Sequence, residues 1–460
     1  MKTALLACAA LLVLAPVAAA AQTPTPAEAA AMDAAITSTL KAENAPSASV
    51  AVVRGGQVVY ARAFGAADLA ARKPATAATR YEIASVSKEV TAAAMLLLAE
   101  DGKLSLDDRV GKWFPELTRA NDITIRQLLS HTSGYSDYWP QDYIMRPMMA
   151  DTTPRAILDG WAKRPLDYEP GAKWQYSNTG YVIAGQIIER VTGEPLFAFL
   201  KRRIFDPLGM TGVRDADSIR RAGGDDAQGY QRYALGPQRS VDREGRGWLY
   251  AMGEINATAS DVAKWDAALM AGRVLKPASL KAMTTEVRLT SGQGSGYGLG
   301  LFIGKSGDRV QWEHGGEGTG FLAENRLWPE RGAAVVVLSN TFSSNAYMTI
   351  ADRLEAILFP PVGVQTTVER LFAALQRGEP DRSAFTDNFN GYLTPQAVAD
   401  YKASLGPLGA PTTFKLERER LRGGMTQRRY RIAAGGKTLT LNSYQAPDGR
   451  FEQFLVDEAH

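Results

Sequence analysis

The sequence predicts an α+β fold in which one antiparallel sheet is flanked by helices and carries an inserted helical lobe, followed by a small C-terminal α+β domain. The first observation is that strand-like segments gather at the two ends of a long region: two at 48–53 and 57–60, and four at 297–303, 309–313, 322–328 and 334–338. The second is that helical patterns and loops fill the stretch between them, from about 104 to 282. The third is a pair of prolines, Pro360-Pro361, which precedes a last segment with its own helices and strands.

The N-terminal residues are typical of a secretory signal. Lys2 supplies one positive charge, an apolar run covers 4–17, and small residues end at Ala21. The run is too short to span a bilayer as an anchor, although a buried N-terminal helix is the alternative. We therefore expect residues 1–21 to be a signal peptide and the protein to be exported, periplasmic or secreted, with no stable membrane insertion after the signal is removed.

The next segments follow in order. Residues 22–44 read as a leader and a helix, with apolar residues spaced four apart over 27–40. The segments 48–53 and 57–60 are joined by Gly55-Gly56, which predicts a β-hairpin. A short extended piece at 81–84 then leads into an apolar helix over 86–100, which ends at Asp101-Gly102.

The remaining elements complete two domains. The four later strands are separated by short turns, as in an antiparallel meander, and a helix over 345–359 follows them. We expect residues 45–360 to form the main domain. Residues 366–460 are expected to form a small C-terminal α+β domain of unknown role, with two helical stretches and strands at 414–420, 427–432 and 438–444.

Composition excludes several classes of function. The 52 basic and 49 acidic residues nearly balance, and no basic stripe stands out, so nucleic-acid binding is disfavoured. Cys8 is the single cysteine and lies in the expected signal, which leaves no disulfide and no cysteine-ligated metal in the mature chain. The three histidines are too few and too scattered for a zinc hydrolase, and no Gly-x-Ser-x-Gly elbow occurs. We expect no cofactor and no metal.

Ser85 and Lys88 form a Ser-x-x-Lys pair at the start of the apolar helix. This spacing places both side chains on one helix face, and a lysine whose pKa is lowered by burial can take the proton of a serine hydroxyl. Spacing alone is weak evidence, because Ser38 and Lys41 repeat it in a polar helix. Only Ser85 has a strand before it and an apolar helix after it. The alternative is a helix-capping serine followed by a surface lysine.

Two further motifs can complete a site. Tyr176-Ser177-Asn178 precedes an apolar helix, where the tyrosine can shuttle a proton and the amide can hold a substrate carbonyl, or where the residues merely pack and cap. His314-Gly315-Gly316 follows the strand 309–313, and its glycines allow close approach of substrate backbone, or form an ordinary turn. Lys305-Ser306-Gly307 is a rival to it, but is predicted at the opposite end of the strand.

In this order and context, the motifs resemble the serine β-lactamase and penicillin-binding-protein superfamily, in its class C β-lactamase-like branch. That branch includes D-Ala-D-Ala carboxypeptidases, D-aminopeptidases and lactamase-fold esterases. The resemblance covers roughly 45–359, and Gly320-Phe321 and the stretch from Thr124 to Gly134 (TIRQLLSHTSG) also fit it.

The resemblance implies a role for each residue, carried over by position. Ser85 is expected to be the acylated nucleophile, with Lys88 and Tyr176 sharing its proton and later activating water. The residues expected to bind substrate are Asn178, His314 and Gly316, and the backbone N–H groups expected to form the oxyanion hole are those of Ser85 and Glu317. The substrate is expected to be a small molecule or a peptide, and the oligomeric state stays open.

One departure bears on the substrate. Class C β-lactamases carry Lys-Thr-Gly where this chain has His314-Gly315-Gly316, and a neutral histidine holds a carboxylate less well than an ammonium group does. The predicted function is therefore hydrolysis of a D-amino-acid peptide or small ester through an acyl-enzyme. The alternatives are β-lactamase activity and a catalytically silent peptidoglycan- or β-lactam-binding module.

A histidine and a long loop-rich stretch lie outside these motifs. His131 follows a predicted helix and is expected to brace a turn rather than to react. The loop-rich stretch from Arg214 to Met252 is expected to border the substrate pocket, unless it is a plain surface excursion.

Overall fold

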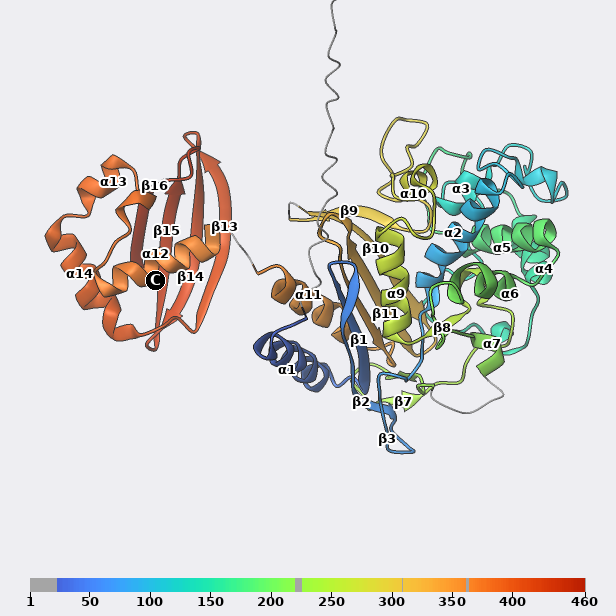
Figure 1. Ribbon diagram of the computed structural model, residues 1–460, viewed down its shortest axis with the longest axis horizontal. Helices are drawn as coiled ribbons and strands as arrows, with labels where there is room; N and C mark the ends of the chain where they lie inside the picture. Colours follow the sequence, from blue (N-terminus) through green and yellow to red (C-terminus); the bar gives the residue numbers. More distant parts are fainter. Residues whose placement is uncertain (1–22, 220–225, 308, 361–363, 460) are drawn as a thin grey trace, which may run out of the picture. The chain divides into compact units, whose positions relative to one another are not determined.

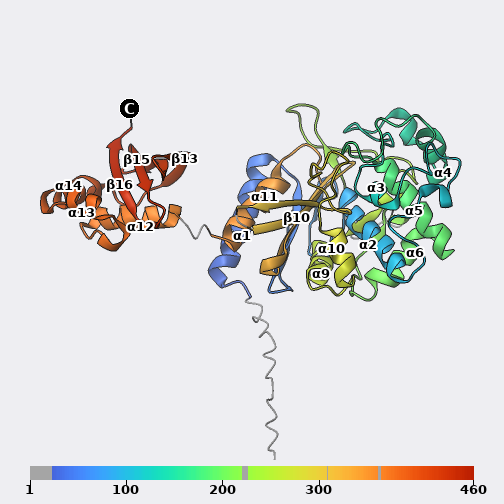
Figure 2. The same ribbon diagram turned by 90° about the horizontal axis from the view of Figure 1, so that it is seen from above.

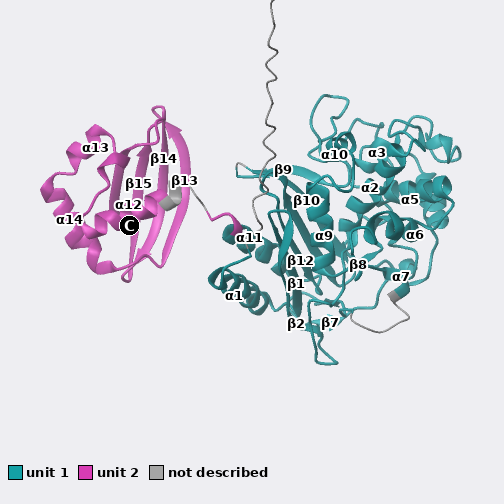
Figure 3. Cartoon of the chain, in the orientation of Figure 1, with its two compact units in different colours: residues 1–357 teal, residues 358–460 magenta. Residues whose placement is uncertain are grey.

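The computed structural model describes residues 23–219, 226–307, 309–360 and 364–459. The predicted signal peptide, residues 1–21, lies outside the described residues. Two compact units divide the chain between Ile357 and Leu358, close to the Pro360-Pro361 pair (Figure 3). Among the described residues, no helix combines the length and the apolar character that a membrane crossing requires.

The first unit is built on a seven-stranded antiparallel sheet in the order β3-β2-β1-β12-β11-β10-β9. The N-terminal strands β1 (Ser47–Arg54) and β2 (Gln57–Asp68) form a hairpin, and β1 pairs with β12 (Ala333–Ser339) in the centre of the sheet. Both central strands are buried Val-rich runs, because helices cover the sheet on both faces. The sheet's other strands are β3 (Lys73–Pro74), β9 (Phe302–Ser306), β10 (Arg309–Gly318) and β11 (Phe321–Trp328).

Helices lie on both faces of this sheet (Figures 1 and 2). On one face are α1 (Pro26–Glu43), whose buried apolar residues Met32, Ile36 and Leu40 are four apart, and α11 (Ala346–Leu358). On the other face, α9 (Ala259–Met270) packs against β1, β2 and β12. The helical lobe lies on the far side of α9 from the sheet (Figure 1). In the sequence, the lobe is inserted between the first strands of the sheet and its last four.

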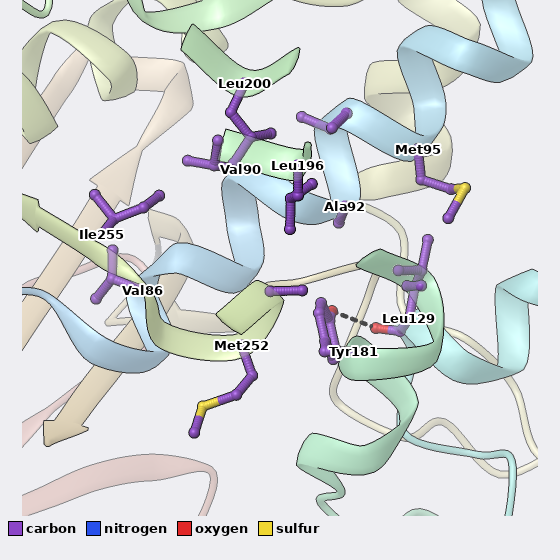
Figure 4. Packing of buried hydrophobic residues seen from close by; sticks show 14 of the residues in the cluster. Val86, Val90, Ala92, Met95, Leu129, Tyr181, Leu196, Leu200, Met252 and Ile255 are labelled. Atoms are coloured by element: carbon purple, nitrogen blue, oxygen red, sulfur yellow. Dashed lines mark hydrogen bonds between the residues drawn. The ribbon is translucent and has the colours of Figure 1, made fainter. Parts of the chain in front are cut away.

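The lobe packs around α2 (Ser87–Glu100), which is buried along most of its length, and nine of its 14 residues are Ala, Leu, Val or Met. Figure 4 shows Val90 of α2 beside Leu196, and Val86, which directly precedes α2, beside Ile255. The lobe's other helices are α3 (Ile125–Leu129), α4 (Pro154–Ile157), α5 (Asn178–Thr192), α6 (Leu196–Leu200), α7 (Ala216–Ile219), α8 (Tyr250–Gly253) and α10 (Pro277–Met283). Two small sheets complete the first unit: β4 (Tyr81–Glu82), β8 (Ile255–Ala257) and β5 (Arg214–Asp215) form one, and β6 (Tyr230–Gln231) with β7 (Arg239–Ser240) forms the other, which lies against the end of the large sheet.

The second unit is a four-stranded antiparallel sheet, β13-β14-β15-β16, covered by three helices. Its core joins apolar side chains of α12, such as Leu371 and Phe372, to strand residues such as Ile432 and Phe454. The helices are α12 (Val364–Arg377), α13 (Asp387–Tyr392) and α14 (Pro395–Leu405), and the strands are β13 (Thr413–Arg422), β14 (Met425–Ala434), β15 (Lys437–Gln445) and β16 (Phe451–Glu458).

Several predicted boundaries were wrong. The strand expected over 297–303 begins only at Phe302, because glycines let the preceding residues turn against the start of α2. Gly300 has a φ of 83°, and a Cβ there would lie 2.7 Å from the carbonyl oxygen of Lys88. The strand expected to end at Glu313 continues to Gly318, paired throughout with β11. β16 was missed because a bulge beside Gln445 breaks the alternation, so that Phe451 and Phe454, three apart, are both buried.

Candidate active site

Ser85 lies in a single 3₁₀ turn, Ala84–Val86, placed between β4 and α2. The sequence predicted Ser85 at the start of an apolar helix over 86–100, and in the structure this helix begins at Ser87, two residues after Ser85. Ala84 has a φ of 45°, a strained value for a residue with a Cβ. The turn is held by the neighbouring sheet, because Ile83 donates its N–H to the carbonyl of Ile255 in β8. Ser85 is thereby presented at the edge of a cavity.

Lys88 contacts Ser85 directly. Its Nζ lies 2.9 Å from the Ser85 Oγ and 2.9 Å from the carbonyl oxygen of Met252, and the side chain is completely buried. Burial lowers the pKa of Lys88 to about 7, against a smaller opposing effect of the Asp137 carboxylate. A large fraction of the amine is therefore neutral near pH 7. In that form the Ser85 hydroxyl can donate its proton to the amine lone pair.

The second Ser-x-x-Lys pair has no such environment. Ser38 lies in the exposed part of α1, where its Oγ donates to the carbonyl of Ala34 at 2.6 Å. This is the ordinary behaviour of a serine within a helix.

Tyr176 also contacts the nucleophile. Its hydroxyl hydrogen-bonds to Ser85, and its ring centroid is 4.9 Å from the Nζ of Lys88. Burial raises the pKa of Tyr176 well above its usual value, and the carboxylates of Asp137 and Glu317 act in the same direction. The phenol therefore stays protonated at neutral pH and can relay a proton, while Lys88 is the group that titrates there.

His131 supports Tyr176 from behind. The two rings stack with centroids 4.2 Å apart, and the Nδ1 of His131 accepts a 3.1 Å hydrogen bond from the N–H of Ser177. His131 has a φ of 58° directly after α3 and is fully buried. Burial and the nearby Lys88 ammonium lower its pKa far below the usual range, so the ring is neutral. As expected, His131 has a structural role, and the segment that it holds carries the Tyr176 motif.

Asn178 begins α5 and lines the cavity. Its Nδ2 donates to Asp137 at 3.3 Å, and its backbone N–H donates to the same carboxylate at 3.1 Å. A carboxylate accepts hydrogen bonds, so this contact fixes the amide and leaves the Asn178 Oδ1 as a buried acceptor without a partner among the described residues. Asp137 was not predicted. An acidic residue shortly after the Gly134 turn was the only signal, and it does not reveal which amide the carboxylate meets.

His314 lines the same cavity in a neutral form. Its Nδ1 lies 2.6 Å from the carbonyl oxygen of Gly315, which can only accept, so Nδ1 carries the proton. Its Nε2 then accepts from the Tyr297 hydroxyl at 2.9 Å. Burial lowers the pKa of His314 to about 3. Both ring nitrogens are thus occupied within the protein, and the ring offers a substrate no positive charge.

Gly316 and Glu317 bring β10 against the nucleophile turn. A Cβ on Gly316 would lie 2.2 Å from the carbonyl oxygen of Ile83, so glycine is required for this approach. Gly318 and Phe321 flank a two-residue turn and form a hydrogen-bonded pair, and such pairs alternate along an antiparallel ladder. The N–H of Glu317 therefore points away from β11, on the side where β9 pairs only as far as Glu313.

These residues surround one cavity of about 1040 Å³. The predicted residues found on its wall are Ser85, Tyr176, Asn178, His314, Gly316 and Glu317, and Lys88 lies directly behind Ser85. The stretch 214–252 borders it, as predicted, through residues such as Tyr233 and Asp242. Lys305 and Ser306 line a separate hollow beside Glu355. Across the described part of the chain, no cluster of potential ligands could hold a metal ion.

Comparison with known proteins identifies the family. The family model described as Beta-lactamase matches residues 32–358, which is more than half of the chain. The chain belongs to the Beta-lactamase family. The predictions of fold class and of family are confirmed, as is the assignment to serine hydrolases.

Relatives within this family differ in their described activities. The chain is 28% identical over 341 residues to penicillin-binding protein 4* of Bacillus subtilis, covering 68% of this chain and 72% of that protein. It is 29% identical to a D-aminopeptidase of Cereibacter sphaeroides, covering 65% of this chain and 58% of the relative. The crystal structure of D-amino acid amidase from Ochrobactrum anthropi is similar with a TM-score of 0.62 and 28% identity, covering 72% of this chain and 97% of that one.

Proposed function

We propose that the protein is an exported serine hydrolase that cleaves an amide or ester bond through an acyl-enzyme on Ser85. The observation that carries the proposal is the 2.9 Å contact between the Ser85 Oγ and a buried Lys88 whose pKa is lowered to about 7. The D-aminopeptidase and D-amino acid amidase relatives support a D-amino-acid amide or peptide as the substrate class.

Acylation starts from the neutral amine. As the Ser85 Oγ attacks the substrate carbonyl carbon, its proton passes to the Nζ of Lys88. The carbonyl oxygen becomes an oxyanion, which the N–H groups of Ser85 and Glu317 stabilise. Tyr176, hydrogen-bonded to Ser85, passes its proton to the leaving amine or alcohol as the C–N or C–O bond breaks, and takes the proton that Lys88 holds, which returns Lys88 to its neutral form.

Deacylation reverses these roles. A water molecule attacks the ester carbonyl of the acyl-enzyme and gives its proton to the Lys88 and Tyr176 pair. The bond between the carbonyl carbon and the Ser85 Oγ then breaks, and Ser85 regains its proton as the acid leaves. The cycle consumes one water and needs no cofactor.

Asn178 orients the substrate in this scheme. Its Oδ1 has no partner among the described residues, and its Nδ2 is held by Asp137. The free oxygen accepts an N–H of the substrate beside the bond to be cleaved. We propose His314 and Gly316 as the wall against which the far end of the substrate lies.

Two alternatives are less well supported. β-Lactam antibiotics carry a carboxylate, and the neutral His314, with both nitrogens occupied, gives that group no cation. A catalytically silent binding module does not require a buried lysine 2.9 Å from a serine. Removing a lysine from water is costly, which makes retention without catalysis a poor explanation.

A labelling experiment and a substrate panel test the proposed function. Intact mass after treatment with a fluorophosphonate is expected to show one adduct, absent from Ser85→Ala. Nitrocefin, a p-nitrophenyl ester and D-alanyl p-nitroanilide then compare the three chemistries, and the anilide or the ester is expected to be turned over far faster than nitrocefin. Equal labelling of Ser85→Ala contradicts the assignment of the nucleophile.

Export is proposed from the N-terminal sequence alone, since residues 1–21 lie outside the described residues. N-terminal sequencing of protein from the periplasm or medium is expected to begin near Gln22. An intact N-terminus on protein from the cytoplasm contradicts it.

A further inference from the structure

The cavity around Ser85 carries charge of one sign. Four carboxylates line it: Asp137, Asp142, Asp242 and Glu317. Among the lining residues, all within the described chain, there is no lysine or arginine. Lys88 lies behind Ser85 rather than on the wall. Neutral donors such as the Gln141 amide also occur, but none of them carries charge.

Three of these carboxylates have no counter-ion among the residues that the structure describes. The side chains of Asp142, Asp242 and Glu317 are exposed, and none forms an ion pair with any residue the structure describes. Glu317 and Asp142 are close enough to repel, since partial burial and the Asp142 charge together raise the pKa of Glu317. A cation placed between these two groups would relieve the repulsion.

A second observation points to the same kind of ligand. Asn178 is 7% exposed, and its Oδ1 has no partner among the described residues while its Nδ2 is held by Asp137. A buried, unsatisfied acceptor on a cavity wall is costly unless a ligand donates to it. The cavity therefore offers negative charge from its exposed carboxylates and a hydrogen-bond acceptor from the Oδ1 of Asn178. Both features fit a substrate that presents N–H groups.

We propose that this site selects substrates that carry a protonated amine close to the bond being cleaved, and disfavours those that carry a carboxylate there. The inference rests on the proposed function and names its substrate class. A free α-amino group has a pKa of about 8, so most of it is charged at pH 7. The rim of carboxylates attracts this charge from solution and holds it near Glu317 and Asp142.

Three substrates that differ in the group carried on the amine, and therefore in charge and in size, test the proposal. D-alanyl p-nitroanilide carries a cation, its N-acetyl form is neutral, and its N-succinyl form carries a carboxylate. At pH 7 and low salt, kcat/KM is expected to fall in that order, by about tenfold or more from first to last. Raising the salt to about 0.5 M is expected to shrink the ratio of kcat/KM for the amine substrate to kcat/KM for the succinyl substrate, because exposed charges are screened.

Matched variants localise the effect. Glu317→Gln and Asp142→Asn are each expected to lower the ratio about two- to fivefold, as exposed charge pairs contribute modestly. Glu330→Gln is the control, since Glu330 is exposed on the turn between β11 and β12, away from the cavity, and it is expected to leave the ratio unchanged. A ratio at or below one, or a ratio that neither variant moves, overturns the proposal.

A binding measurement tests the preference for a protonated amine independently of whether the protein cleaves the substrate. Ser85→Ala retains every lining carboxylate but lacks the nucleophile, so dissociation constants of the three anilides can be measured on it by calorimetry. Tightest binding of the amine and weakest of the succinate are expected even if no anilide is cleaved. The reverse order, or equal binding, overturns the inference, whereas fluorophosphonate labelling of Ser85 decides the proposed function independently.

Discussion

Replacing Lys88 by methionine should abolish turnover and stabilise the protein at neutral pH. Methionine has nearly the length of the lysine stem and fits an apolar site without a charge. Lowering the pKa of Lys88 from 10.5 to about 7 corresponds to about 5 kcal/mol at about 1.4 kcal/mol per pH unit. That penalty applies in full below pH 7, where the lysine is charged in the folded and unfolded chains alike.

The destabilising effect of Lys88 depends on pH. Between about pH 7 and 10.5 the unfolded chain keeps the proton that folded Lys88 has released, so wild-type stability rises with pH across this window. The penalty is then about 4 kcal/mol at pH 7 and about 2 kcal/mol at pH 9. The variant loses the hydrogen bonds to Ser85 and Met252, together about 2 kcal/mol. Lys88→Met is therefore expected to be about 2 kcal/mol more stable at pH 7 and about equally stable at pH 9.

Urea unfolding followed by tryptophan fluorescence measures this difference. All eight tryptophans precede residue 358, so the signal reports the first unit alone. Other titrating groups are common to both proteins and largely cancel in the comparison. The exposed Lys103→Met is the control and is expected to show no pH-dependent difference. A stability difference between Lys88→Met and wild type that stays constant from pH 7 to 9 refutes the reasoning.

Three further outcomes are expected. Glu89 is buried near the Asp266 carboxyl, and burial raises the pKa of Glu89 to about 8. The folded protein therefore keeps a proton that the unfolded chain releases, so the stability of the protein should fall as the pH rises from about 4.5 to 8. Thermal melts of Glu89→Gln should show a flatter dependence of stability on pH, and an unchanged dependence contradicts this. Asp137→Asn should lower kcat/KM about tenfold to a hundredfold and move the acidic limb of its pH profile to lower pH, because the Asp137 charge raises the pKa of Lys88; a profile that stays in place leaves only a structural role. Gly316→Ala should cost about 1–3 kcal/mol in unfolding free energy and most of the activity, whereas Gly315→Ala, whose Cβ would meet nothing closer than 3.8 Å, should be mild; equal effects contradict the close approach of β10 to the nucleophile turn.

The sequence was sufficient to predict one antiparallel sheet built from strands at both ends of the first unit, because strands with strong apolar runs alternate with glycine turns. It was insufficient where the backbone responds to a distant neighbour. Gly300 turns because the carbonyl of Lys88 lies against it, and β10 continues past Glu313 because β11 pairs with it. The bulge beside Gln445 likewise hid β16.

The candidate site shows the same division. Local spacing and context placed Ser85, Lys88 and Tyr176, whose motifs are continuous in sequence. Asp137 was missed because its partner, Asn178, lies 41 residues away. His314 was expected from the sequence to be neutral, but its hydrogen-bond partners, the Tyr297 hydroxyl and the carbonyl of Gly315, were beyond local reasoning.

The most direct test of the central claim is the pH dependence of fluorophosphonate labelling at Ser85, followed by peptide mass mapping. Because the neutral Lys88 amine removes the serine proton, the labelling rate is expected to rise through a midpoint near pH 7, with the adduct on Ser85 alone. An adduct on another residue, or a rate that does not change between pH 5 and 9, contradicts a lysine-activated Ser85.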